Sequence, residues 1–282
     1  MSKRYICYNG SYFRDEETVI SHRNRSFAYG DALFETIHCL GTEPQSIDKH
    51  WARLERGMKK LKMEPRDVIS KELLNFYIGK LLNKNRIFKG ARIRLVVFRN
   101  EGGLYAPATN MISWTMESSP LDSEQFSLNS KGLTADIFDE VHKPVNPLSN
   151  LKTANALVYV LAGIFRIENG LDDCFILNQY GRIAETNHSN LFVFLDNMLI
   201  TPPLSEGCVA GTMRNTVIEL ARSEGYNVTE KGLLERNILE AEEIFITNAI
   251  QGIQWIGSYK DKRYFNFIAR KLIIKLNETV FG

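Results

Sequence analysis

Residues 146–162, NPLSNLKTANALVYVLA, begin with a polar segment that contains Pro147 and continue into a long apolar run. The spacing of the apolar residues predicts a helix over residues 153–168, and Gly170 is a suitable residue to end it. Lys152 lies just before this helix among apolar neighbours, so its amine is expected to be partly buried. Burial lowers the pKa of a lysine and makes its amine nucleophilic towards carbonyl groups. The stretch thus contains both a predicted helix and a candidate reactive lysine.

The second half of the chain is rich in strands. Its apolar runs contain many β-branched and aromatic residues, and Tyr180-Gly181 and Asp196-Asn197 mark turns between them. An amphipathic helix is expected over residues 212–224 and a final helix over residues 263–276. The predicted strands are CFILN (174–178), RIAET (182–186), NLFVFL (190–195), MLITP (198–202) and EEIFITN (242–248).

The first half is predicted to begin with a hairpin over residues 5–13, because Asn9-Gly10 separates two apolar runs. Ser46 is the expected N-cap of a helix over residues 46–61. Pro65 suits the first turn of a second helix that continues to Leu82. Strands are expected over ARIRLVVFR (91–99) and MISWTME (111–117).

These elements predict an α+β fold with two domains. A length of 282 residues is consistent with about two domains in one compact body. The polar segment that contains Pro120 is the expected boundary. We therefore predict a smaller N-terminal α/β domain over residues 1–117, a linker over 118–125, and a larger C-terminal domain over 126–282 that carries Lys152.

The composition excludes several classes of function. The net charge is only +2, so there is no electrostatic basis for binding nucleic acid or a membrane surface. No apolar stretch is long enough for a membrane span, and the N-terminus lacks the apolar core of a signal peptide. The four scattered cysteines have no metal-like spacing, and the five histidines form no metal motif. We expect reduced thiols, no metal, and a cytoplasmic location.

Three further segments contain candidate binding groups. Glu185 stands at the end of a predicted strand, where a carboxylate could pair with a protonated ring nitrogen. Gly211 directly precedes an amphipathic helix, and the free N–H groups at a helix start favour an anion such as phosphate. Arg53, three residues after His50, could supply a forked donor to phosphate. Taken singly, each is a weak signal: Glu and Arg side chains are more often exposed at the surface, and many helices begin after a glycine.

The order and spacing of these motifs resemble the class IV aminotransferases of fold type IV. That group includes branched-chain aminotransferases, D-amino-acid aminotransferases and 4-amino-4-deoxychorismate lyases. The resemblance extends from about Tyr5 to Ile256. The motifs are NRSFAYGDALFETI (24–37), HWARL (50–54), NLK (150–152), ETNHSNLF (185–192), GTMR (211–214) and FITNAIQGI (245–253).

The resemblance implies pyridoxal 5′-phosphate as the cofactor. Lys152 matches the lysine that carries the cofactor as a Schiff base and later shuttles the Cα proton. Glu185 matches the glutamate at the pyridinium nitrogen, and Arg53 matches the arginine of the phosphate cup. The remaining implied cofactor contacts are Val209 against the ring, Gly211, Thr212 and Met213 at the helix start, and Asn248 and Ala249 in a second phosphate turn.

Some positions depart from the family pattern. Aminotransferases of this class often have threonine at the positions of Met213 and Ala249, so two hydroxyl contacts are lost while backbone donors remain. Many members have a tyrosine four residues after the lysine. Ala156 stands there in this chain, which would open the substrate pocket.

The motifs indicate the cofactor more sharply than the reaction. Leu104 replaces an arginine that binds the substrate carboxylate in lyases, and this favours an aminotransferase that acts on an amino acid and a 2-oxo acid. Met213 and Asn248-Ala249 resemble the lyase forms of their motifs. Thr36 matches a threonine that lyases place near the substrate. The alternative is therefore a 4-amino-4-deoxychorismate lyase, which releases pyruvate and 4-aminobenzoate.

Two residues are expected in the substrate pocket for either reaction. Arg94 is the candidate for the substrate carboxylate, because a guanidinium pairs well with a carboxylate, and Phe34 would line the pocket. Strand alternation places Arg92 and Arg94 on one face. A third hypothesis is a non-catalytic relative that binds the cofactor without turnover, although Lys152 and Glu185 together argue against it. The resemblance also implies a homodimer, the commonest closed assembly.

Overall fold

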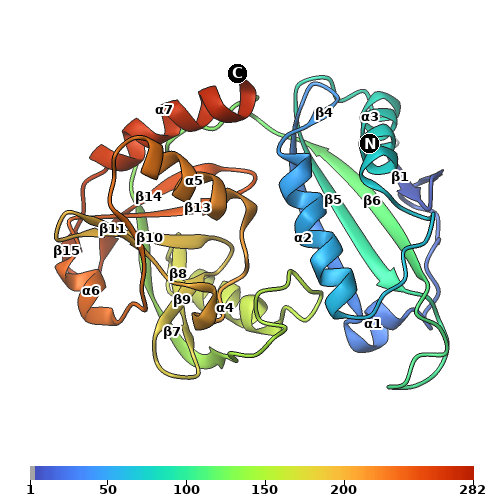
Figure 1. Cartoon of the computed structure of the whole chain (residues 1–282), viewed down its shortest axis with the longest axis horizontal. Coiled ribbons are helices and arrows are strands. Elements are labelled where there is room, and N and C mark those ends of the chain that lie inside the picture. Colours follow the sequence, from blue (N-terminus) through green and yellow to red (C-terminus); the bar gives the residue numbers. More distant parts are fainter. Residues whose placement is uncertain (1–3) are drawn as a thin grey trace. The chain divides into compact units, whose positions relative to one another are not determined.

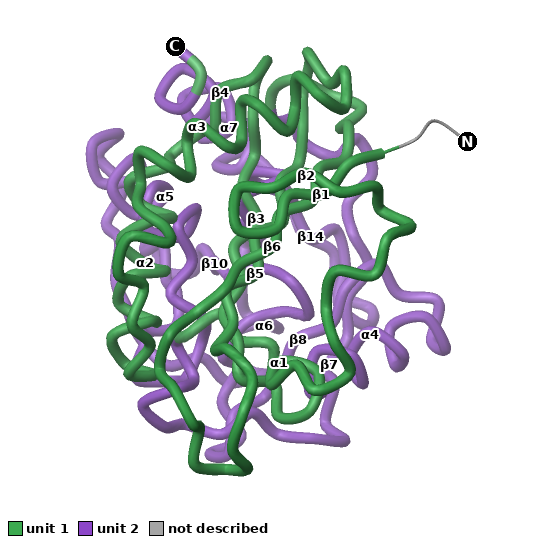
Figure 2. The backbone as a smooth tube through the Cα atoms, turned by 90° about the vertical axis from the view of Figure 1, so that its right-hand side faces the viewer, with its two compact units in different colours: residues 1–125, 151–155, 281 green, residues 126–150, 156–280, 282 purple. Residues whose placement is uncertain are grey.

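The computed structural model describes residues 4–282. Within them the chain divides into two compact units, which Figure 2 colours separately. In this part of the chain no helix has the length and apolar character needed to span a membrane. Unit 1 comprises the chain up to Gln125 with Leu151–Asn155 and Phe281, and unit 2 comprises Phe126–Asn150, Ala156–Val280 and Gly282.

Unit 1 is built on a sheet whose paired strands are all antiparallel. The Asn9-Gly10 hairpin is confirmed: both residues have positive φ angles, 45° and 86°, as a tight turn between twisted strands requires. The described strands, in sheet order, are β2 (Ser11–Arg14), β1 (Tyr5–Tyr8), β6 (Ile112–Pro120), β5 (Gly90–Arg99), β3 (Ala32–Leu40) and β4 (Glu43–Pro44). Because β6 continues to Pro120, the first residues of the predicted linker belong to a strand.

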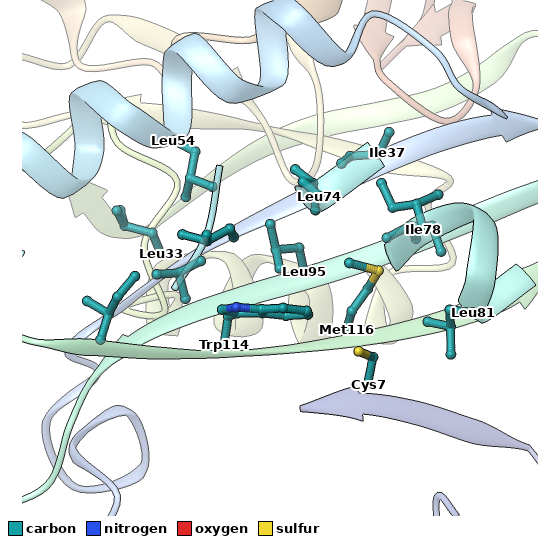
Figure 3. Packing of buried hydrophobic residues seen from close by; sticks show 14 of the residues in the cluster. Cys7, Leu33, Ile37, Leu54, Leu74, Ile78, Leu81, Leu95, Trp114 and Met116 are labelled. Carbon is teal, nitrogen blue, oxygen red and sulfur yellow. The ribbon is translucent and has the colours of Figure 1, made fainter. Parts of the chain in front are cut away.

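Two helices, α2 (Ile47–Lys60) and α3 (Lys71–Lys84), pack on this sheet (Figure 1). Figure 3 shows side chains of the apolar cluster between these helices and the sheet, among them Leu54 of α2, Leu74 of α3 and the buried Trp114 of β6. Each fully buried side chain of this size contributes roughly 1.5–3 kcal/mol by leaving water. The periodic apolar positions of the sequence therefore become one core.

The helix starts differ from the sequence predictions in two places. Ser46 does precede α2, but its φ is 53° and its side chain makes no capping hydrogen bond. Pro65 is not in the first turn of α3. That helix begins after Ser70, whose hydroxyl accepts the Leu73 N–H at 3.2 Å and so satisfies one of the open donors. A further short helix, α1, spans Arg25–Tyr29.

Unit 2 contains a larger mixed sheet. The strand runs predicted from residues 174–248 all occur as strands, and β7 and β14 add long central strands that the sequence did not single out. Within the described residues, the order is β12 (Val228–Glu230), β11 (Met198–Thr201), β10 (Asn190–Leu195), β13 (Glu243–Asn248), β14 (Gly252–Tyr259), β7 (Leu133–Lys143), β8 (Asp173–Asn178) and β9 (Ile183–Thr186), with β15 (Lys262–Arg263) beside β14.

The helices of unit 2 are α4 (Leu157–Glu168), α5 (Thr212–Ser223), α6 (Glu235–Glu240) and α7 (Phe267–Phe281), with a 3₁₀ turn at Leu204–Glu206. The prediction for α5 is confirmed to within one residue. The final helix begins later than predicted, because Arg263 pairs with Ser258 as part of β15.

The predicted helix over residues 153–168 is too long at its start. Residues 151–155 are extended instead and pair with β3 in unit 1. The Phe34 N–H donates to the Lys152 carbonyl at 2.9 Å, and the Ala154 N–H donates to the Ala32 carbonyl at 3.0 Å. These bonds satisfy part of the open edge of β3, which outweighs the local helix preference. They also place Lys152 in unit 1, whereas the sequence placed it in the C-terminal domain.

Candidate active site

The lysine predicted to be reactive lies over an aromatic ring in unit 1. The Lys152 Nζ is 4.3 Å from the centroid of the Phe34 ring, and the Arg94 Cζ is 4.6 Å from the same centroid. Thr36 pairs directly with Arg94 across β3 and β5, so their side chains share this face of the sheet. The structure therefore brings together Lys152 and the three predicted substrate residues of unit 1.

Strand alternation explains why Arg94 is available on that face. Ile93 and Leu95 are fully buried in the core, whereas the side chain of Arg94 is 39% exposed. The Arg94 Nε lies 4.0 Å from Glu117 Oε1 on the next strand, a loose contact for an ion pair. The Arg94 guanidinium therefore makes no tight ion pair with Glu117.

Arg53 is not a surface arginine. It is 7% exposed, and its Nε donates to Glu35 Oε1 at 2.8 Å while its Nη2 donates to Glu35 Oε2 at 2.5 Å. His50 and Arg53 are three residues apart on α2 and so lie on the same helix face. The His50 Nδ1 is 2.7 Å from Glu35 Oε2, and because the carboxylate can only accept, Nδ1 carries the proton.

The charge of this cluster is settled by its contacts. Burial alone would raise the pKa of Glu35, but the Arg53 guanidinium and the His50 hydrogen bond together lower it to about 2. Burial lowers the pKa of His50, so this ring is neutral near pH 7. Glu35 is therefore an ionised carboxylate that orients Arg53, a role the sequence did not reveal for it.

The Gly30-Asp31 motif serves a structural purpose in unit 1. Asp31 Oδ2 accepts from Arg25 Nε and from Arg99 Nε, each at 2.9 Å. Arg25 Nη1 also donates to the Leu104 carbonyl at 2.6 Å, which holds the loop containing Leu104 by its backbone. The Leu104 side chain remains 76% exposed.

In unit 2, Glu185 is 3% exposed on β9, which excludes a surface turn. Its Oε1 accepts from Lys143 Nζ and from the Tyr159 hydroxyl, the latter at 2.7 Å. Its Oε2 accepts the Val209 N–H at 2.9 Å. Sequence reasoning did not find Lys143 or Tyr159, since neither stands at a recognisable spacing from Glu185.

The loop with Val209 leads into the predicted phosphate site. Asn190 Nδ2 donates to the Val209 carbonyl at 2.9 Å, and α5 begins after Gly211 with no side chain capping it. A Cβ on Gly211 would lie 1.9 Å from Asn190 Oδ1, so any side chain there would displace the Asn190 amide. The first-turn N–H groups of Thr212 and Met213 thus open a helix whose dipole favours an anion.

The second predicted phosphate turn follows β13. Asn248 Oδ1 accepts the N–H groups of Ile250 and Gln251, at 3.0 and 2.9 Å, which shapes the turn that contains Ala249. The preceding Thr247 pairs with Asn190, so both side chains lie on one face of the sheet. Among the described residues, Thr247 Oγ1 is buried without a hydrogen-bond partner.

The last predicted substrate residue, Ala156, is the N-cap of α4 in unit 2 and is half-buried. Another residue that the sequence did not mark is Asn150. Its Nδ2 donates to the carbonyls of Leu204 and Cys208, at 2.8 and 2.7 Å, and its carbonyl accepts the Ala210 N–H at 3.0 Å. It therefore anchors the loop that carries Val209.

The family called Amino-transferase class IV matches residues 32–259 of the chain. The chain belongs to this family. The match includes β3 with Glu35, the segment with Lys152, the Glu185 network, and the turn after β13. As a member of the class IV aminotransferases the protein is an enzyme, and its motifs from Ala32 onwards fall within the matched region.

Its relatives carry two different activities. It is 28% identical to the aminodeoxychorismate lyase of Bacillus subtilis (strain 168), over 87% of this chain and 83% of that protein. It is 25% identical to the branched-chain-amino-acid aminotransferase of Escherichia coli (strain K12), over 90% and 84%. In fold it is similar to the branched-chain aminotransferase of Thermoproteus uzoniensis solved with norvaline, with a TM-score of 0.87, 21% identity, and 98% and 94% coverage.

Proposed function

We propose that this class IV aminotransferase uses pyridoxal 5′-phosphate to transfer an amino group between an amino acid and a 2-oxo acid. The donor set fits that cofactor. Unit 2 has a buried carboxylate in Glu185, an uncapped helix start after Gly211, and a buried hydroxyl without a partner in Thr247. Unit 1 has a lysine amine on the Phe34 ring. When bound, the cofactor ring supplies an electron sink for the charge left at the amino-acid Cα.

Each of these residues has an assigned role in the proposal. Lys152 holds the cofactor through its amine and moves the proton at the substrate Cα. Glu185 pairs with the ring nitrogen. The phosphate is bound by Arg53, by the N–H groups of Thr212 and Met213, and by the turn with Asn248 and Ala249. Gly211 permits the close approach, and Val209 packs against the ring.

The observation that carries the proposal is the shared ring of Phe34. Lys152 Nζ and Arg94 Cζ lie 4.3 and 4.6 Å from its centroid, so one apolar surface has an amine and a guanidinium beside it. An α-amino acid presents a carboxylate one bond from the carbon whose proton must move. Arg94 would bind that carboxylate while Lys152 acts at Cα. Thr36, which pairs with Arg94, would border the side-chain pocket.

A second candidate function is 4-amino-4-deoxychorismate lyase. It is supported by the B. subtilis lyase, which is 28% identical to this chain where the E. coli aminotransferase is 25% identical, and by Thr36 opposite Arg94 on the same face. Leu104 favours the aminotransferase, because it provides no positive charge for a carboxylate of the lyase substrate. Both functions need the same cofactor residues.

The deciding experiment is a visible absorption scan of the purified protein with pyridoxal phosphate, before and after single amino acids are added. An aminotransferase loses its yellow band with its substrate amino acids and regains it with a 2-oxo acid. A band that no amino acid bleaches, together with pyruvate release from aminodeoxychorismate, would establish the lyase. A protein that stays colourless with added cofactor would refute both, and a cofactor-bound protein inert to every substrate would be a non-catalytic relative.

We also propose a homodimer in the cytoplasm. The helix α4 exposes an apolar stripe at helical spacing, in which Leu157 and Ile167 are 77% and 71% exposed. Monomeric proteins rarely leave such a face in water, and a second copy of the same helix would cover it. The cytoplasmic location is supported by the four cysteines, all buried and unpaired.

A further inference from the structure

Lys143 is a buried cation in unit 2 that no motif of the sequence explains. It is 6% exposed at the end of β7, and its Nζ donates to Glu185 Oε1 and to the Tyr159 hydroxyl, the latter at 2.6 Å. The Tyr159 hydroxyl donates in turn to Glu185 Oε1 at 2.7 Å. Three side chains from β7, α4 and β9 thus meet at one carboxylate oxygen.

The hydrogen bonds leave Glu185 one acceptor position. An ionised carboxylate has roughly four such positions, two on each oxygen. Lys143 and Tyr159 use both positions of Oε1, and the Val209 N–H at 2.9 Å uses one on Oε2. The remaining position is on Oε2, which these donors hold in a fixed orientation.

Lys143 supplies the charge in this network. Burial, followed by the neighbouring Glu185, raises the pKa of Tyr159 well above its ordinary range, so its hydroxyl is a neutral donor. A buried carboxylate without a compensating cation takes up a proton and becomes a neutral acid. A protonated Glu185 could still donate to an unprotonated ring nitrogen, but it could not stabilise a protonated one.

We infer that Lys143 is a positioning residue that keeps Glu185 ionised and directs its free Oε2 position to the cofactor ring nitrogen. This inference rests on the proposed function, since it takes Glu185 as the partner of that nitrogen. Lys143 then affects turnover only through its effect on Glu185. In a chain that already has a neutral residue at position 185, the loss of Lys143 has no further effect on turnover.

The test is a double-mutant cycle of Lys143→Met and Glu185→Gln in the full-length protein, with Lys143→Arg and Tyr159→Phe as matched variants. The first measurement is urea unfolding without cofactor. Lys143→Met should lower the unfolding midpoint because it strands a buried carboxylate, and adding Glu185→Gln should restore the midpoint. Lys143→Arg keeps the charge and should stay near wild type.

The second measurement is kcat at saturating cofactor and substrate. Lys143→Met should lower kcat roughly tenfold to a hundredfold, the range seen when a residue that orients a ligand-binding group is lost. Lys143→Arg should recover most of this loss, and Tyr159→Phe, which removes only a neutral donor, should lose less than Lys143→Met. In the Glu185→Gln background, Lys143→Met should change kcat less than about twofold.

Additive effects of the two substitutions on kcat would overturn the inference, as would failure of Lys143→Arg to recover turnover in a protein of normal stability. A wild-type protein that binds no pyridoxal phosphate would instead overturn the proposed function. The unfolding cycle would then still report whether Lys143 and Glu185 form the buried pair.

Discussion

The backbone N–H of Phe34 donates to the carbonyl of Lys152 at 2.9 Å, and the Lys152 amine turns back over the Phe34 ring at 4.3 Å. The lysine is therefore held by backbone pairing as well as by its own side chain. Because residues 151–155 behave as an added strand on β3, the position of the amine depends on the rigid sheet of unit 1.

Replacement of Lys152 tests the assignment of the reactive amine. Lys152→Ala should lower kcat roughly 100- to 10,000-fold, the contribution of a positioned acid–base group, while folding is preserved. Borohydride reduction of the wild-type holoenzyme should fix the cofactor on Lys152 alone, as read by peptide mass mapping. Lys80→Ala, at an exposed site on α3, is the control. Label on another lysine would show that the assignment is wrong.

The Glu35 cluster predicts that the free energy of unfolding decreases at acidic pH. The pKa of Glu35 falls from an ordinary 4.5 to about 2 in the fold, so the unfolded chain binds more protons between these values. At 1.36 kcal/mol per pKa unit, this shift contributes about 3 kcal/mol to the free energy of unfolding. The contribution is fully present above pH 4.5 and is lost as the pH falls towards 2. Urea unfolding measured from pH 6 to pH 2.5 checks it.

Glu35→Gln should remove that pH dependence and, by releasing Arg53, weaken pyridoxal-phosphate binding roughly tenfold or more. Asp48→Asn, at an exposed ion pair with Lys71 on the surface of α2, should change neither quantity. If the Glu35→Gln variant loses as much stability between pH 6 and pH 2.5 as the wild type, the role given to this carboxylate is wrong.

Arg94 is predicted to bind the substrate carboxylate. Arg94→Leu should lower kcat/KM roughly tenfold to a hundredfold, equivalent to the loss of a charged hydrogen bond of about 1.5–3 kcal/mol, with cofactor binding unchanged. Arg92→Leu, two residues away on the same face of β5, is the matched control. Equal losses in both variants would point to a general charge effect and against a specific contact.

Gly211 is predicted to be needed for tight phosphate binding. A Cβ at this position lies 1.9 Å from Asn190 Oδ1, so Gly211→Ala must displace Asn190 and with it the loop at Val209. We expect destabilisation of about 1–3 kcal/mol and clearly weaker pyridoxal-phosphate binding in a fluorescence titration. Gly163→Ala, in α4 with no contact shorter than 3.7 Å, should leave binding intact. Equal binding by both variants would argue against a phosphate at this helix start.

The apolar stripe of α4 is predicted to form a subunit interface. Leu157→Lys combined with Ile164→Lys places two charges on that stripe and should shift the protein from dimer to monomer in sedimentation velocity, because a buried unpaired charge opposes association. Val141→Lys, at an exposed site on β7, is the control. A wild-type protein that sediments as a monomer would disprove the interface.

Local signals along the chain specify most of the elements and the chemical identity of the site. The Asn9-Gly10 turn, the alternation along β5 and the glycine before α5 can all be read from the residues alone, because each depends on backbone geometry within a few residues. Ordered motifs marked Lys152, Glu185 and Arg53, since reactive side chains recur at similar places along a family's chain.

The way those side chains are held follows from contacts between distant parts of the chain. The fork of Arg53 on Glu35 and the contact of Lys143 with Glu185 join residues 18 and 42 positions apart. The pairing of residues 151–155 with β3 replaced a predicted helical turn for the same reason: the open strand edge that needed partners is more than a hundred residues away in the sequence. Such bonds depend on which buried polar groups the fold leaves unsatisfied, and no local pattern contains that information.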